Sequence, residues 1–561
     1  MQYPSRHFLI LIFAWLIAGA LTMAQALADD PASQQLRDQQ RALRQLEHQQ
    51  RLQRWQRPWT PDSTEVTSPD QPSDGHCWKT SGVRLAGSQL LAPQLLETTV
   101  RPLVPACMGI ASINRLLKAI TQLYVQAGYP TSRAYLQQAP HDGEPLAIVV
   151  IEGFVESIEF AGAELPLSLR GAFPDVLGRP LYLPDLEQGL DQLNRLRAYE
   201  LGIDLLPGQI PGGTRVHVVP HKVASRWHLD SHFDNRGSAL TGRHRLSLSL
   251  GLDSPLGLND DLRLSRVSTV VDAPGQSQGI NLHYSIPYGP WTFALNASEL
   301  RYGAPIPHSP HTTSGRSSYQ GLNLERTLWR DQRGMLSVSG RLNRKQLINR
   351  SNNAVLAFQS PTLTTLEAGV NLLWLDHGLW NAYLGMSQGV DWFGADRSAL
   401  RADAPRPDFR KYSASLFHLR QGPAHRPWRW HSELALQWSD DVLPAVEQRL
   451  LSDDSAVRGF RQATHAGANA ALWRNTLSQV LPMDWTGPVQ VRPYLGLDLG
   501  WVQLAGDSPR HRLAGAAVGM ELSLPSSRLR LDYQHALYAS DLPRSSGLER
   551  GFWVLEWSLN I

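Results

Sequence analysis

From about residue 225 to the C-terminus, apolar and polar side chains alternate with a period of two. This period is typical of β-strands whose two faces meet different surroundings. In an early run, Leu246, Leu248, Leu250 and Leu252 alternate with Ser247, Ser249 and Gly251. In the last run, Trp553, Leu555, Trp557, Leu559 and Ile561 alternate with Val554, Glu556, Ser558 and Asn560. We therefore predict an all-β domain over residues 223–561.

The two faces and the length of this domain favour a transmembrane barrel over a soluble sandwich. One face is apolar with aromatic residues near the strand ends, and the other is polar or charged. A membrane barrel places the first face against lipid and the second toward a lumen. At roughly 20 residues per strand and connection, the segment holds about 16 strands, enough to leave a water-filled lumen.

Two copies of a small α/β unit precede the predicted barrel, over residues 77–152 and 153–222. In the first copy we expect strands at 83–85, 133–137 and 146–152 and helices at 88–99 and 110–127. In the second we expect strands at 155–160, 202–206 and 214–220 and helices at 165–172 and 184–199. Each unit has an open sheet edge, which is a natural place for a guest strand.

The N-terminal residues 1–28 have the features of a secretory signal peptide. A short basic start at Arg6 and His7 is followed by an apolar run that ends near Ala20, and by a small-x-small cleavage pattern at residues 24–26 or 26–28. The alternative, a membrane anchor, would be about 14 residues long and therefore short for a ~20-residue span. We expect the mature chain to reach an oxidising compartment, where Cys77 and Cys107, the only two cysteines, form a disulfide.

Residues 29–57 are polar and predict a helix, since no Gly or Pro interrupts positions 32–57. A basic stripe runs along it at steps of four, three, four and three residues, formed by Arg37, Arg41, Arg44, His48 and Arg51. The stripe suits either a solvated or coiled-coil helix or a helix inside a polar pore. Residues 58–76 contain four prolines among polar residues and predict an extended linker.

Charge and motifs argue against nucleic-acid binding, hydrolase activity and metal binding. Lys and Arg total 53 against 50 Asp and Glu, so a net charge of +3 argues against a strongly basic nucleic-acid binder. Residues 385–389 match a nucleophile-elbow pattern around Ser387, but no helix follows them as that motif requires. His308 and His311 have no acidic or Cys ligands nearby. We therefore expect no enzyme, no metal site and no cofactor.

Several short motifs together resemble one family, the two-partner secretion transporters (TpsB proteins). The motifs lie at residues 107–110, 128–136, 234–237, 241–243, 254–260, 457–460 and 497–500. The resemblance spans nearly the whole mature chain. It implies that the two α/β units are periplasmic POTRA domains, and it places the chain in the superfamily that also contains the outer-membrane barrel-assembly insertases.

Two of these motifs predict the centre of the barrel: Val457, Arg458, Gly459 and Phe460, and Leu497, Asp498, Leu499 and Gly500. On the second, Asp498 has the opposite parity to the apolar Leu497 and Leu499, so it faces the lumen. Gly496 and Gly500 leave room beside it. By resemblance, the loop that carries Arg458 folds back into the lumen and meets Asp498, where an Arg–carboxylate pair fixes orientation as well as position. Taken alone, Arg458 would be a surface-loop arginine.

The resemblance implies an exporter in the outer membrane of a Gram-negative bacterium. It would bind a large, unfolded partner protein with an N-terminal secretion domain, such as a haemolysin, adhesin or contact-dependent toxin, and export it through the barrel, with the 29–57 helix as a plug. Other expected partners are outer-membrane lipid and the barrel-assembly machinery. An insertase usually carries more POTRA domains and lacks the plug helix and linker, and a passive porin or receptor would not need the tandem units.

Overall fold

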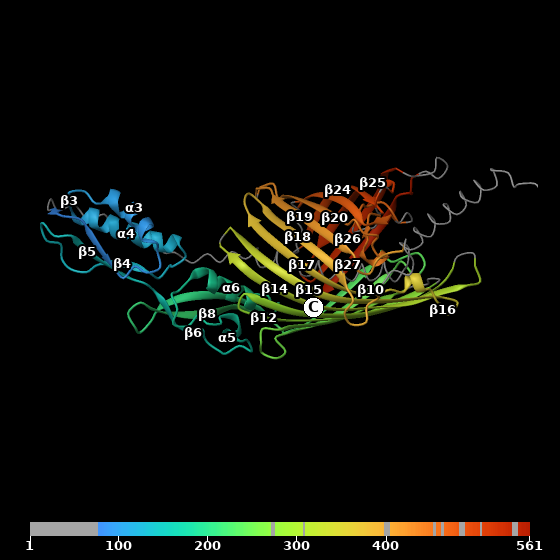
Figure 1. Cartoon of the computed structure of the whole chain (residues 1–561), viewed down its shortest axis with the longest axis horizontal. Coiled ribbons are helices and arrows are strands. Elements are labelled where there is room, and N and C mark those ends of the chain that lie inside the picture. Colours follow the sequence, from blue (N-terminus) through green and yellow to red (C-terminus); the bar gives the residue numbers. More distant parts are fainter. Residues whose placement is uncertain are drawn as a thin grey trace, which may run out of the picture.

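A computed structural model describes residues 77–561 apart from short segments. The segments left out are 271–274, 307–308, 332, 398–403, 424, 453–455, 462–464, 482–488, 505, 507 and 541–547. The predicted signal peptide, linker and helix 29–57, with Arg37, Arg41, Arg44 and Arg51, lie outside the described residues, as does His308. Two small α/β units at one end of the molecule lead into a large barrel (Figure 1).

The first unit packs two helices on a three-stranded sheet. Its elements are β1 (Trp78–Lys79), β2 (Val83–Ala86), α3 (Pro93–Val100), η1 (Arg101–Leu103), β3 (Cys107–Met108), α4 (Ile110–Gln126), β4 (Arg133–Leu136) and β5 (Leu146–Ile151). The sheet order is β2-β5-β4, with β2 parallel and β4 antiparallel to β5. Helix α4 buries Ile113, Leu116, Ile120 and Tyr124, whose three- to four-residue spacing forms one face. The predicted helix 88–99 begins only at Pro93, which suits the first helical turn.

A disulfide joins Cys77 to Cys107, as the two-cysteine composition predicts. The two Cα atoms lie 5.5 Å apart, and 30 residues separate the cysteines. The short strands β1 and β3 pair beside the bond, with Lys79 opposite Cys107. Closing a loop of this length stabilises the fold by roughly 3–4 kcal/mol in the chain-entropy model. The bond therefore ties the start of the unit to the segment that enters α4.

The second unit repeats the order of the first and packs against it. Its elements are β6 (Phe154–Phe160), α5 (Leu169–Ala172), α6 (Leu183–Asn194), β7 (Tyr199–Pro207) and β8 (Gly213–Val223), in the sheet order β6-β8-β7. The backbone N–H of Leu183 donates to the carbonyl of Gly128 at 2.8 Å, and the rings of Tyr129 and Tyr182 lie 5.3 Å apart. The predicted helices 165–172 and 184–199 are shorter in the structure. None of the helices among the described residues has the length and hydropathy needed to cross a membrane.

Sixteen strands in the described part of the chain form the closed barrel. They are β9 (Trp227–Asp234), β10 (Arg245–Asp253), β11 (Asp261–Thr269), β12 (Gln276–Tyr288), β13 (Trp291–Pro305), β14 (Thr312–Arg330), β15 (Gly334–Ser351), β17 (Thr362–Leu375), β18 (Leu379–Val390), β19 (Arg410–Gln421), β20 (Trp428–Trp438), β23 (Asn469–Gln479), β24 (Gln490–Gln503), β25 (Arg510–Ser523), β26 (Ser527–Ala539) and β27 (Phe552–Asn560). Each strand pairs antiparallel with the next, and β27 closes the ring on β9. The short strands β16 (Ala354–Val355), β21 (Arg449–Leu450) and β22 (Ala466–Gly467) and the 3-10 turns η2 (Ala357–Gln359) and η3 (Ala445–Glu447) belong to connections.

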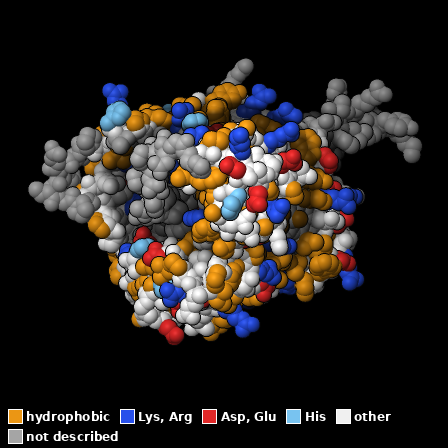
Figure 2. Space-filling model, turned by 90° about the vertical axis from the view of Figure 1, so that its left-hand side faces the viewer, with side chains coloured by type: hydrophobic (Ala, Val, Ile, Leu, Met, Phe, Trp, Pro, Cys, Tyr) orange, Lys and Arg blue, Asp and Glu red, His pale blue; other side chains and the backbone are white. Residues whose placement is uncertain are grey.

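The alternation read from the sequence separates the two faces of the barrel wall. On β24, Leu495 and Leu497 are 61% and 48% exposed, whereas the side chain of Asp498 is fully buried. Outward leucines recur on the other strands, for example Leu264 and Leu384. The outward leucines and the buried Asp498 thus give the barrel an apolar outer face and a polar lining, as in a lipid-embedded barrel. At the end that carries the small units, by contrast, apolar and charged side chains are interspersed on the surface (Figure 2).

Candidate functional site

The connection between β20 and β23 (residues 439–468, of which 439–452, 456–461 and 465–468 are described) folds back into the barrel. Its strands β21 and β22 pair as a small hairpin, and the N–H of Val457 donates to the carbonyl of Leu451 at 2.9 Å. Val457 and Phe460 are buried in a cluster with wall residues of β23, β24, β25 and β26, among them Leu472, Val502, Leu513 and Ala536. Apolar contacts therefore hold the tip of this loop against one wall.

Arg458, at the tip of the loop, binds Asp498 on β24 with three hydrogen bonds. Its Nε donates to Oδ2 at 2.6 Å, its terminal Nη2 to Oδ1 at 2.6 Å, and its backbone N–H to Oδ2 at 3.0 Å. The side chains of Arg458 and Asp498 are 1% and 0% exposed. The pair is bidentate and shielded, so it fixes the position of the loop and the orientation of the guanidinium group.

Neighbouring strands complete the surroundings of the pair. Nη2 of Arg458 also donates to the carbonyl of Asn475 at 2.8 Å, and Nη1 donates to the hydroxyl of Thr476 at 3.3 Å, both on β23. Nε of Arg474 lies 3.7 Å from Oδ2 of Asp498, directly across the β23–β24 ladder. One carboxylate thus faces two guanidinium groups. Without Asp498, Arg458 of the loop and Arg474 of the wall would face each other with no anion between them.

Glycines leave the space that the loop occupies. A Cβ on Gly496 would lie 2.2 Å from Nη1 of Arg458, and a Cβ on Gly515 would lie 1.7 Å from its backbone oxygen. A Cβ on Gly500 would lie 2.4 Å from the side chain of Leu451. Gly459 has φ +94°, a conformation that costs glycine little and strains other residues. The tip therefore needs small residues on both the loop and the wall.

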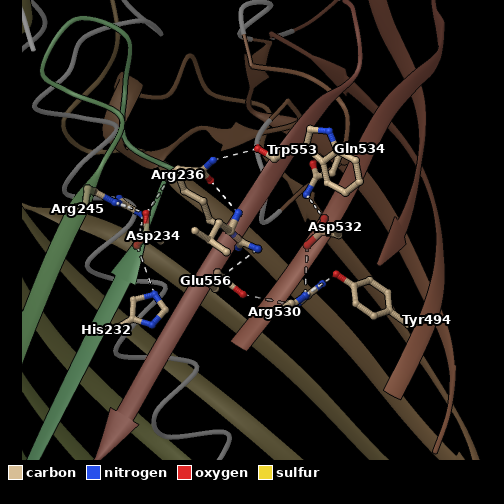
Figure 3. A network of polar contacts seen from close by, with 12 residues as sticks. His232, Asp234, Arg236, Arg245, Tyr494, Arg530, Asp532, Gln534, Trp553 and Glu556 are labelled. Atoms are coloured by element: carbon tan, nitrogen blue, oxygen red, sulfur yellow. Dashed lines mark hydrogen bonds and ion pairs between the residues drawn. The ribbon is translucent and has the colours of Figure 1, made fainter. Parts of the chain in front are cut away.

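A polar network links the loop tip to the seam where β27 meets β9 (Figure 3). The N–H of Gly459 donates to Oε1 of Gln534 at 3.1 Å, and Gln534 donates to Asp532 at 2.8 Å. Arg530 lies 3.4 Å from Asp532 and 3.8 Å from Glu556.

At the seam, Glu556 of β27 pairs with Arg236 at 3.0 Å, just beyond the end of β9. The alternation in the sequence places Arg530, Asp532 and Gln534 on the polar face, but no local pattern indicates their partners. Only closure of the barrel brings Arg236 and Glu556 together.

The second α/β unit is bound to the turns at one end of the barrel. Arg195, the residue just after α6, donates to the hydroxyl of Ser285 at 2.6 Å and to the carbonyl of Asn259 at 2.8 Å. Glu187 and Asp191, both on α6, pair with Arg330 at the end of β14. Burial raises the pKa of Glu187 above its ordinary value, and the nearby Arg330 opposes the shift. This end of the barrel therefore carries the tandem units through a charged, largely buried interface.

The remaining sequence candidates lie away from this site. Ser387 sits within strand β18, which continues to Val390, so the strand–turn–helix context of a nucleophile elbow is missing there. His311 contacts Asn352 across a loop. Among the described residues, no group of three or more His, Cys, Asp or Glu side chains is placed to hold a metal ion.

Known protein families match most of the chain, in the same order of domains. The family model described as haemolysin secretion/activation protein ShlB/FhaC/HecB matches residues 212–522. The chain belongs to this family. Two POTRA domain models match residues 78–153, as the ShlB-type domain, and residues 154–207. The two small units are thus POTRA domains, and the barrel is the transporter domain of the ShlB/FhaC/HecB family.

Individual relatives agree with this assignment. The haemolysin transporter protein ShlB of Serratia marcescens is 34% identical over 540 residues, covering 95% of this chain and 92% of the relative. The haemolysin transporter protein HpmB of Proteus mirabilis is 33% identical, covering 89% and 87%. The structure of CdiB from Escherichia coli superposes with a TM-score of 0.83 at 27% identity, covering 94% of this chain and 98% of that one. This member of the family is therefore an outer-membrane transporter with periplasmic POTRA domains.

Proposed function

We propose that this transporter exports one large secreted partner protein by two-partner secretion. The observation that carries the proposal is a 16-stranded barrel whose lumen holds an anchored loop and whose end is bound to the second of two tandem POTRA domains. The relatives are named as haemolysin transporters or as the transporter CdiB, so a haemolysin, an adhesin or a contact-dependent toxin is the expected cargo. The partner would arrive unfolded in the periplasm, and its folding outside would give export a direction.

The POTRA sheets offer edges for the arriving chain. In the sheet order β2-β5-β4, strands β2 and β4 lie at the edges, and in the order β6-β8-β7, strands β6 and β7 do. An extended segment that adds to such an edge gains main-chain hydrogen bonds whatever its sequence, and side-chain pockets add specificity. We propose that the secretion domain of the partner binds in this way. Outer-membrane lipid and, during assembly, the barrel-assembly machinery are further proposed partners.

Coexpression with a candidate partner, a large secreted protein that carries an N-terminal secretion domain, tests the function. We expect that protein in the medium when the transporter is present, and in the periplasm when it is absent, because only a dedicated pore carries a large unfolded chain across the outer membrane. Immunoblots of both fractions give the readout. Release of a periplasmic enzyme controls for leakage. Cargo that reaches the medium equally well without the transporter would refute the proposal.

The predicted helix 29–57, which lies outside the described residues, is proposed to plug the resting pore. Its basic stripe and glutamine-rich surface suit a polar lumen better than a dry core. Deleting residues 31–57 is expected to raise ion conductance in planar bilayers, because the lumen loses a solute-excluding segment. Heat-modifiable mobility checks that the barrel remains folded. Unchanged conductance in a folded barrel would mean that this helix is not the plug.

A further inference from the structure

A second ionic contact holds the lumen loop, away from the Arg458 site. Glu447 lies in the 3-10 turn η3 of the loop and is 3% exposed. Its Oε1 accepts a hydrogen bond from Nζ of Lys345 on β15 at 2.5 Å. Its Oε2 lies 2.5 Å from Nζ of Lys411 on β19. One loop carboxylate is thus shared by two lysines of the barrel wall.

The contact spans a curved part of the wall and involves the loop backbone. Strands β17 and β18 lie between β15 and β19 in the barrel order, so the two lysines reach Glu447 from separated strands. The carbonyl of Glu447 also accepts from Nζ of Lys411 at 3.3 Å and from Nε2 of Gln437 on β20 at 3.2 Å. Both the backbone and the side chain of Glu447 are therefore bound to the wall.

The two ionic contacts have opposite polarity. At Asp498 the wall supplies the anion and the loop supplies a cation, whereas at Glu447 the loop supplies the anion and the wall supplies two cations. A buried charge that loses its partner is strongly disfavoured. Neither contact therefore opens freely on its own. While one holds, the loop remains attached to the wall and the other partners stay close enough to re-form their bonds.

We propose that Glu447 is a positioning residue that forms a second anchor of the 439–468 loop, and that the lumen opens fully only when both anchors are released. Arg458 would hold the tip against β24, and Glu447 would hold the entry of the loop against β15 and β19. The inference rests on the proposed function only in taking the lumen as the export path. Because it concerns the state of the barrel, it can be tested without cargo.

Ion conductance of the full-length chain in planar bilayers tests the second anchor. Glu447→Gln keeps the size of the side chain but removes the negative charge that Lys345 and Lys411 share, so the ionic contact between the loop and the wall is lost. We expect the fraction of time spent in conducting states to rise about tenfold, the change that roughly 1.4 kcal/mol produces in a two-state equilibrium. We also expect selectivity to shift toward anions, because the lumen wall then carries one negative charge fewer beside Lys345 and Lys411. A conducting fraction that is unchanged by Glu447→Gln, both in the full-length chain and in the chain that lacks residues 31–57, would overturn the proposal.

The control is Glu367→Gln, which removes a different luminal carboxylate. Glu367 of β17 pairs with Arg341 and Tyr383 on neighbouring wall strands, at 3.1 and 2.6 Å. This variant should leave the conducting fraction near that of the unmodified chain, and an equal rise in both variants would contradict a specific anchor.

The triple variant Glu447→Gln, Lys345→Gln and Lys411→Gln separates the anchor from simple electrostatics. The unmodified cluster has two cations and one anion, whereas the triple variant has none of these charges. Its selectivity should therefore move back from anions and slightly past that of the unmodified chain toward cations, while its conducting fraction stays high. If Glu447→Gln fails to assemble, Lys411→Gln removes one partner only and should give a smaller rise. No rise in assembled Lys411→Gln would then overturn the proposal. If Glu447→Gln shows the expected rise in conductance but the unmodified chain exports no cargo, the second anchor stands and the proposed function fails.

Discussion

Arg458→Ala and Asp498→Ala are each expected to abolish or strongly reduce export while the barrel still assembles. The pair is almost fully buried, with three hydrogen bonds of 2.6 to 3.0 Å. Removing one partner of a buried ion pair typically costs about 3–5 kcal/mol, because the other charge is left without compensation. Removing Asp498 also affects Arg474, because its Nε lies 3.7 Å from the same carboxylate. The strands themselves keep their ladders, so the fold should survive.

The double variant distinguishes one shared interaction from two independent roles. If Arg458 and Asp498 act only through each other, the double variant should be no worse than the worse single variant. The measurement is cargo in the medium, beside heat-modifiable mobility of the barrel. Arg316→Ala is a suitable control, because Arg316 pairs with Glu299 at 2.6 Å on an exposed surface, where such pairs contribute about 0–1 kcal/mol. Defects that simply add in the double variant would show that the two residues act separately.

Gly515→Ala is expected to displace the loop tip without changing any charge, and to lower export by about tenfold. Gly515 stands opposite Asp498 in the β24–β25 ladder, and its missing side chain makes room for the loop. A Cβ there would lie 1.7 Å from the backbone oxygen of Arg458. The loop cannot yield toward β26, since a Cβ at Gly459 would already lie 2.4 Å from the backbone of His535. Overpacking of this kind costs about 1–3 kcal/mol, and 1.4 kcal/mol is a factor of ten.

Gly340→Ala provides the matched comparison for this variant. It makes the same substitution in strand β15, where an added Cβ meets nothing within 4 Å. Export by Gly340→Ala should therefore equal that of the unmodified chain, and barrel mobility should be normal in both variants. The accessibility of the loop to an external protease gives a second readout, because a displaced tip should be cleaved more readily. Normal export and protection in Gly515→Ala would mean that the loop does not need its observed position.

The sequence by itself determined the local architecture of this protein. Strand alternation depends only on which side chains tolerate lipid and which tolerate water, so the barrel and the lumen-facing parity of Asp498 could be predicted without coordinates. The spacing of apolar residues likewise predicted helix α4. Element ends were less certain, as with the helix that begins at Pro93, because capping and packing against neighbours set them. The Cys77–Cys107 bond required only the count of cysteines and their compartment.

Only the tertiary structure decided which polar residues meet inside the barrel. Glu447 meets two lysines that lie about 100 and 36 residues away in the chain, and Arg236 meets Glu556 only because the last strand pairs with the first. Such contacts depend on the register of every ladder and on closure of the ring, and no local pattern encodes those quantities. The alternation shows that a residue faces the lumen, but the choice of partner follows from the three-dimensional path of the loop and wall together.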